Sequence, residues 1–240
     1  DSKLSAPKNS NLKTVMDFSF FDKINIAKNE QTETWFKGLD RVYNNFVYDF
    51  LYPNPASVLA FIENHDTDRF LGEGDNLPML KQASTLLLTT RRIPQLYYGT
   101  EIMMNGVKSK SDGYVRKDFP GGWADDTATA LTTTGRTKIQ NECYNFYKTI
   151  LNWRKGNDVI AKGSMVQFMV QNGVYAYARL HEGKTVFVML NGTDAETTVP
   201  LKFYKEILKE CKQGKDILSG KTIAFGEELK MAPRESLVIE

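Results

Sequence analysis

Short apolar runs that end in polar residues alternate with amphipathic stretches over the first two-thirds of the chain. Three runs, at 12–21, 57–62 and 93–98, predict strands, and the last two are apolar enough for burial on both faces. Apolar residues recur at helical spacing over 34–48 and over 137–155, which predicts a helix in each segment. Strands therefore alternate with helices, as in parallel α/β units.

A further helix is predicted between the second and third strands, where Asn76 suits the N-cap and Pro78 the first turn. The apolar face of this helix consists of Leu80, Ala83, Leu86 and Leu87. The corresponding face of the last helix consists of Ile139, Cys143, Phe146, Tyr147 and Ile150. Residues 103–135 form a long irregular stretch, and such a segment inside a compact domain is usually functional.

The helical period disappears after about residue 160. Short strands are predicted there, separated by turn pairs such as Asn172-Gly173 and Glu182-Gly183. The predicted strands are 174–178, 185–190, 197–201 and 236–239. This spacing favours an antiparallel β-sandwich.

The fold class predicted is α/β plus all-β, with three β/α units over 1–157 and a β-sandwich domain over 158–240. Three units do not make a fold, because a parallel barrel closes with eight strands and its strands must be covered on both faces. We therefore expect the first part to be the C-terminal three-eighths of a (β/α)8 TIM barrel. The remaining strands would come from an upstream segment, or the chain would be a processed piece.

Charge, hydropathy and cysteine content argue against some classes of protein but do not identify the function. The net charge is +2 and the basic residues are scattered, so nothing indicates binding to nucleic acid or to an anionic membrane. No apolar run reaches the length of a membrane span. The two cysteines, Cys143 and Cys211, have neither disulfide nor zinc-site spacing.

Candidate chemistry follows the second predicted strand, where the segment 61–67 reads FIENHDT. A carboxylate and an imidazole, Asp66 and His65, stand at the carboxyl end of a buried strand, where barrel enzymes hold catalytic groups. A His-Asp pair at a strand end also occurs as a structural hydrogen-bonded pair or as a helix N-cap. The third strand ends similarly, in PQLYYGTE over 94–101.

The two segments, in this order and spacing, resemble strands 7 and 8 of the α-amylase family of glycoside hydrolases, in its neopullulanase and cyclomaltodextrinase branch. The resemblance covers essentially the whole chain. It implies that Asp66 is the carboxylate that holds the sugar ring at the cleavage point and that His65 donates to hydroxyls of the same sugar. The sequence departs from the family at Arg92, where glycine is usual, and we interpret this as a local packing difference.

Retaining glycoside hydrolysis needs a nucleophile and a general acid, and the family places both after strands that lie upstream of this chain. No Gly-x-Arg-x-Asp element precedes Asp66. Two nearby carboxylates are interpreted as structural: Glu63 as support for the strand end, and Asp68 as an ion-pair partner of Arg69.

The loop after the third strand carries Asp112 and Arg116. By the resemblance, Arg116 binds sugar hydroxyls or holds Asp66, and Asp112 orients Arg116; a solvated loop with local ion pairs is the equal alternative. Trp123 in the same loop either stacks on a glucose or pins the loop to the barrel.

The sequence thus predicts a fragment of a retaining α-glucan hydrolase that cleaves α-1,4-glucosidic bonds and lacks its nucleophile and acid on this chain. The alternatives are a non-catalytic amylase-like binding or scaffold protein and a transglycosidase of the same family. No cofactor or metal is expected on this chain, and calcium would belong to the upstream part. The family's bacterial members are periplasmic or cytoplasmic, and nothing in the sequence separates the two.

Overall fold

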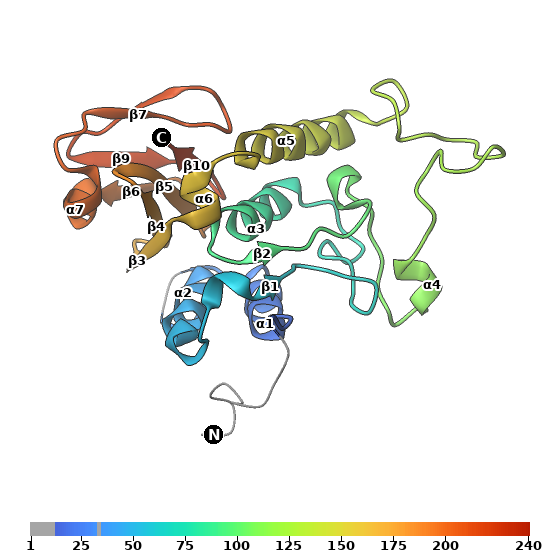
Figure 1. Ribbon diagram of the computed structural model, residues 1–240. Coiled ribbons are helices and arrows are strands. Elements are labelled where there is room, and N and C mark those ends of the chain that lie inside the picture. The colour runs from blue at the N-terminus through green and yellow to red at the C-terminus, as the bar shows by residue number, and fades with distance from the viewer. Residues whose placement is uncertain (1–12, 33–34) are drawn as a thin grey trace.

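The computed structural model describes residues 13–32 and 35–240 (Figure 1). The first elements are α1 (Phe18–Ala27), α2 (Leu39–Val47), η1 (Tyr48–Leu51), η2 (Pro55–Ser57), β1 (Leu59–Ala60), α3 (Leu77–Thr89), β2 (Ile93–Pro94), η3 (Thr100–Ile102), α4 (Asp112–Val115), α5 (Lys138–Arg154) and α6 (Asp158–Lys162). The later elements are β3 (Ser164–Gln171), β4 (Val174–His181), β5 (Lys184–Asn191), β6 (Thr197–Pro200), η4 (Leu201–Tyr204), α7 (Lys205–Leu208), β7 (Gln213–Lys215), β8 (Thr222–Ala224), β9 (Glu228–Met231) and β10 (Ser236–Ile239).

Parallel pairing links the three apolar runs of the first part. Strand β1 pairs with β2 in parallel, and an isolated parallel bridge joins Met16 to Leu59. The strand predicted over 12–21 is confirmed only at this bridge. The prediction is wrong after Asp17, because the Asp17 side chain accepts a hydrogen bond from the Phe20 amide and α1 begins at Phe18. Leu12 lies outside the described residues. The strands predicted over 57–62 and 93–98 exist, but each pairs over only two residues.

The three predicted helices form, and their ends follow their capping residues. Asn76 caps α3, and Thr137 forms a capping box with Gln140 at the start of α5. The helix predicted over 34–48 is shorter, because the described residues before Gly38 are not helical and α2 begins only at Leu39. The predicted face of α5 is buried except for Ile139, which is exposed at the first turn.

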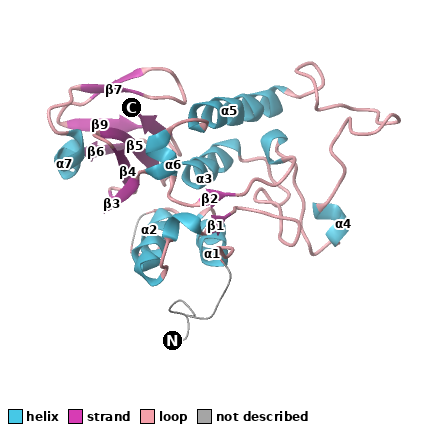
Figure 2. Ribbon diagram, in the orientation of Figure 1, coloured by secondary structure: helices cyan, strands magenta, loops and turns pink. Residues whose placement is uncertain are grey.

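Most of the connection from β2 to α5 is loop, as Figure 2 shows, and this agrees with the predicted irregular stretch. Only the short helices η3 and α4 interrupt it. In Figure 1 the part that carries α4 extends away from the body of the molecule. Within the described residues, every helix is too short or too polar to cross a membrane.

The last part is antiparallel. A four-stranded sheet has the order β10-β5-β4-β3, and two-stranded ribbons β6-β9 and β7-β8 accompany it. The four predicted strands correspond to β4, β5, β6 and β10, and both predicted turn pairs have positive φ. The sequence missed β3 because its residues are only half-buried and lack a clear alternation, and it missed β7 to β9 because they are short.

The four-stranded sheet is buried on both faces. One face of β4, with Val174, Ala176 and Ala178, packs with the residues of β6, η4 and β9. The other face presents Tyr175 and Tyr177 to the helices of the first part, where Tyr177 shares a hydrogen bond with Thr89 of α3. One continuous hydrophobic core therefore joins the sheet to α2, α3 and α5.

Arg92 is a buried structural cation. Its guanidinium lies 3.0 Å from an Asp17 carboxylate oxygen, and it also pairs with Asp49, which in turn accepts from Arg91. Its side chain is fully buried and lies over the rings of Phe46 and Tyr52. The cation thus fastens α1 and η1 to the start of β2, at the end of the strand away from Asp66.

We predict that Arg92→Met lowers the free energy of unfolding by about 3 kcal/mol or more, because it leaves the Asp17 carboxylate buried and unpaired. Urea denaturation of the variant measures the loss. The double variant that adds Asp17→Asn keeps the cap acceptor of α1 and removes the stranded charge, so it should recover part of the stability. Equal stabilities for the two variants would contradict a buried ion pair.

The two cysteines should differ in reactivity. Cys143 is fully buried, and burial raises the pKa of its thiol to about 12, whereas Cys211 is exposed. Because the thiolate is the nucleophile, we predict that a thiol reagent at neutral pH labels only Cys211 in the native protein and labels both cysteines after unfolding. Rapid native labelling of Cys143 would contradict its packing between α5 and η3.

Candidate functional site

The segment after β1 turns sharply and holds His65 and Asp66 at the surface. The Asn64 side chain accepts from the Asp66 amide at 2.8 Å, and the Thr67 hydroxyl accepts from the Asn64 amide at 2.9 Å. These short-range bonds form an Asx turn, which the sequence order Asn-His-Asp-Thr favours. Asn64 is buried in this turn, and the next two side chains remain open to solvent.

His65 and Asp66 present their polar atoms side by side. The His65 Nε2 lies 3.2 Å from an Asp66 carboxylate oxygen, and both side chains are more than half exposed. The structure therefore does not bury the pair as a structural couple. An imidazole and a carboxylate in this arrangement offer donors and acceptors to a polyhydroxylated ligand.

Arg116, from the end of α4, closes the site from the other side. Its Nε donates to the His65 carbonyl at 2.9 Å, and its Nη2 donates to Asp66 at 3.0 Å and to Asp112 at 3.1 Å. Asp112 also lies 3.2 Å from the Lys108 ammonium. The guanidinium thus holds the Asp66 carboxylate against the turn, and Asp112 fixes the guanidinium. The structure brings all four predicted site residues together.

A buried ion pair lies beneath this surface layer. Glu63 and Arg69 are almost completely buried, and the Arg69 Nη1 lies 3.2 Å from the carboxylate. The Glu63 carboxylate also accepts from the Phe70 amide and the Thr100 hydroxyl. Burial raises the pKa of Glu63, while these donors act in the opposite direction.

Arg69 connects the two strand ends to the α4 loop. Its Nη1 donates to the Tyr98 carbonyl at 2.6 Å, and its Nε donates to the Val115 carbonyl at 3.0 Å. Its guanidinium lies 4.0 Å from the centre of the Tyr97 ring, and its Nη2 has no hydrogen-bond partner among the described residues. Val115 immediately precedes Arg116, so Arg69 sets the position from which Arg116 reaches Asp66.

The prediction for Asp68 is wrong. Arg69 pairs with Glu63, whereas Asp68 accepts from the Lys108 amide at 2.6 Å. The role of Arg69 was missed because its neighbour Asp68 offered a local partner. The apolar residues Phe70 and Leu71 that follow were the available sign that this segment turns inward. Trp123 is mostly exposed, so its ring is not buried against the described part of the chain.

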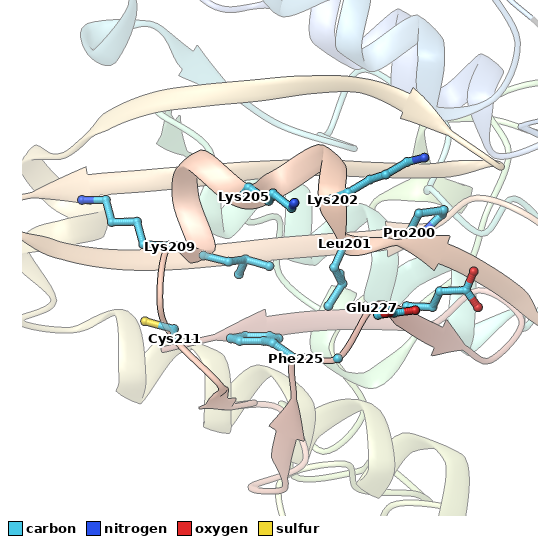
Figure 3. Close-up of a pocket in the computed structure, with 11 residues that line it drawn as sticks. Pro200, Leu201, Lys202, Lys205, Lys209, Cys211, Phe225 and Glu227 are labelled. Atoms are coloured by element: carbon cyan, nitrogen blue, oxygen red, sulfur yellow. The ribbon is translucent and has the colours of Figure 1, made fainter.

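A cavity of about 510 Å³ lies beside α7 and shows no set of functional groups that point toward one another. Figure 3 shows Lys209 extending to the opposite side from Lys202 and Lys205. Within residues 13–32 and 35–240, no cluster of three or more His, Cys, Asp or Glu side chains is placed to hold a metal. The arrangement around Asp66 is therefore the candidate with the clearest chemistry.

The two arginines should contribute very differently to stability. Arg69→Met leaves Glu63 buried without its cation, so we predict a loss of about 3 kcal/mol or more in the free energy of unfolding. Arg116→Met removes only partly exposed pairs and should cost less than about 1 kcal/mol. Urea unfolding of both variants compares them directly. A large loss in Arg116→Met would mean that this residue is structural.

The sequence relatives of the chain have closely related names. Residues 165–240 match the family described as the cyclo-malto-dextrinase C-terminal domain. The chain is 29% identical over 228 residues to a cyclomaltodextrin glucanotransferase of Thermoanaerobacterium thermosulfurigenes, covering 92% of this chain and 28% of the relative. It is 28% identical over 215 residues to an α-amylase of Niallia circulans, covering 86% and 37% respectively. The chain thus spans well under half the length of either relative.

Solved structures agree on the fold. An α-amylase from Anoxybacillus superposes with a TM-score of 0.75 at 18% identity, over 95% of this chain and 47% of the other. The AmyP structure in complex with maltose gives a TM-score of 0.76 at 18% identity, over 98% and 51%. At these identities the likeness establishes a shared fold, which here comprises a helical part and a C-terminal β-rich part.

Proposed function

This chain is related to the enzymes of the α-amylase family, and on that premise we propose that it carries one side of an α-glucan site in a retaining glycoside hydrolase. The observation that supports this proposal most directly is the contact of Arg116 with both Asp66 and the His65 carbonyl. It holds a carboxylate and an imidazole at the surface, fixed from below by Arg69. Such a rigid, exposed pair suits a neutral sugar with several hydroxyls.

Each residue has a proposed role. Asp66 accepts from hydroxyls of the glucose at the cleavage point and favours the distorted ring that resembles the oxocarbenium transition state. His65 hydrogen-bonds the same sugar. Arg116 and Asp112 position Asp66 and line the neighbouring sugar site. The bond cleaved is an α-1,4-glucosidic bond.

We further propose that the parallel segments at Met16, β1 and β2 are strands 6 to 8 of a (β/α)8 barrel. Apolar side chains beside these segments remain exposed, namely Val15, Met16, Phe18, Ile93 and Leu96. Parallel strands are stable only when both faces are covered. An upstream barrel segment would cover these side chains and would supply the nucleophile, the general acid and any calcium site.

Transglycosylation is the second candidate, because the first sequence relative is a glucanotransferase. The same Asp66 and His65 would hold the donor sugar in both reactions. What differs is whether water or a sugar hydroxyl attacks the glycosyl intermediate. Product analysis with maltoheptaose distinguishes them, since transfer gives products longer than the substrate or cyclic products and hydrolysis gives only shorter ones.

The assay uses the complete enzyme, which contains this chain and the proposed upstream strands of the barrel. We predict that Asp66→Asn lowers its kcat on malto-oligosaccharides by several orders of magnitude. The amide keeps the shape but loses the charge that stabilises the cationic transition state. The control is Asp75→Asn, which removes an exposed carboxylate outside the site and should leave turnover unchanged. Near-normal turnover of the Asp66→Asn enzyme would overturn the assignment and favour a scaffold protein with an amylase-like fold.

A further inference from the structure

Two neighbouring aromatic side chains lie exposed ahead of α2. Trp35 is 75% exposed and Phe36 is 61% exposed. Large aromatic rings that stand together on a surface usually mark a binding site, because they leave apolar area in contact with water. Neither ring contacts the residues of the Asp66 site, which includes the end of α4, and Figure 1 shows α4 well away from α2.

The backbone holds Phe36 in an unusual conformation. Its φ angle is +61°, a left-handed value that is rare for a bulky residue. Its amide donates to an Asp40 carboxylate oxygen at 2.6 Å, which fixes the turn into α2. A strained residue that the surrounding structure keeps in place points to a function for its side chain.

Both rings line a groove of about 620 Å³ between this turn and the β3–β4 hairpin. Asn44 and Asn172 bring amide groups to the groove. Each uses its Nδ2 within the protein, Asn44 toward Asp40 and Asn172 toward the Thr198 carbonyl. Their Oδ1 atoms accept no hydrogen bond from the described residues, so they stay available for hydroxyl donors.

The base of the groove is rigid. Tyr43 lines it, and the Tyr43 ring meets the buried Tyr175 ring edge-on at 6.2 Å. The Gln167 side chain donates to the Tyr43 carbonyl and ties α2 to β3. The groove therefore rests on the core that joins the helices to the sheet.

We propose that this groove, the Trp35 groove, is a second carbohydrate site that binds a segment of an α-glucan chain away from the Asp66 site. Aromatic rings stack on the apolar faces of glucose, and the asparagine oxygens accept from its hydroxyls. Asp40 is the only charged side chain among the described residues that line it, which favours a neutral polyhydroxylated ligand over an anion. The choice of α-glucan rests on the proposed function.

Isothermal titration of the protein with maltoheptaose tests the groove, with cellohexaose as the comparison sugar. We expect Trp35→Ala to weaken maltoheptaose binding by about tenfold or more. Trp35→Tyr should keep most of the affinity, because a ring remains. The matched control is Phe50→Ala, which removes an equally exposed ring that does not line the groove and should change nothing. Thermal melts confirm that each variant is folded.

The Asp66→Asn variant distinguishes maltoheptaose binding at the Trp35 groove from binding at the Asp66 site. Binding that survives Asp66→Asn and falls in Trp35→Ala supports the groove, whatever the turnover of the complete enzyme shows. If Trp35→Ala binds maltoheptaose as tightly as the unmodified protein, the groove is not a sugar site, and the proposal for Asp66 is unaffected. Absence of maltoheptaose binding, equal binding of cellohexaose, or a dimer in sedimentation that Trp35→Ala dissociates would each overturn the groove as an α-glucan site.

Discussion

The buried guanidinium of Arg69 is the interaction on which the candidate site depends. It ties the Glu63 carboxylate after β1 to the Tyr98 carbonyl after β2 and to the Val115 carbonyl in the α4 loop. A buried cation of this kind gives little net stability compared with apolar packing, but its removal strands a charge. Its geometric effect is more important, because the loop between β2 and α5 has little regular structure of its own. Arg69 therefore helps to hold Arg116 opposite Asp66, together with the Tyr98 hydroxyl, which donates to the Lys117 carbonyl at 2.7 Å.

The site consequently has two layers with different physical tasks. The lower layer of Glu63 and Arg69 is dry, and its charges compensate one another. The upper layer of His65, Asp66, Asp112 and Arg116 is exposed to solvent, so its ion pairs contribute little to stability. A ligand can therefore replace the solvent around these side chains. This division suits a site that binds neutral sugars, which compete with water through many hydrogen bonds. In our proposal the Trp35 groove recognises sugars differently, through stacking on its aromatic rings.

Features encoded by neighbours in the sequence were predictable, and features encoded by long-range contacts were not. The cap Asn76 and the turn pairs of the β-rich part act within a few residues, and the structure has them where the sequence places them. The clustering of Asp66 with Arg116 followed from the family resemblance. Arg92 finds Asp17 across the chain. Arg69 pairs with Glu63 on the same turn and reaches the distant Tyr98 and Val115 carbonyls, whereas sequence proximity suggested Asp68 as its partner. Strands β1 and β2 pair over only two residues, and the length of the apolar runs did not predict so short a pairing.

We propose that Asp66 is one member of a carboxylate set whose other members lie outside this chain. The most direct measurement is the coding sequence ahead of Asp1, read together with the intact mass of the protein from its source. We expect a strand end with a Gly-x-Arg-x-Asp element, followed by a second strand end with a glutamate, and a mass that includes both. A coding region and a mass that contain neither would contradict the proposed role of Asp66, because no nucleophile or general acid would accompany it.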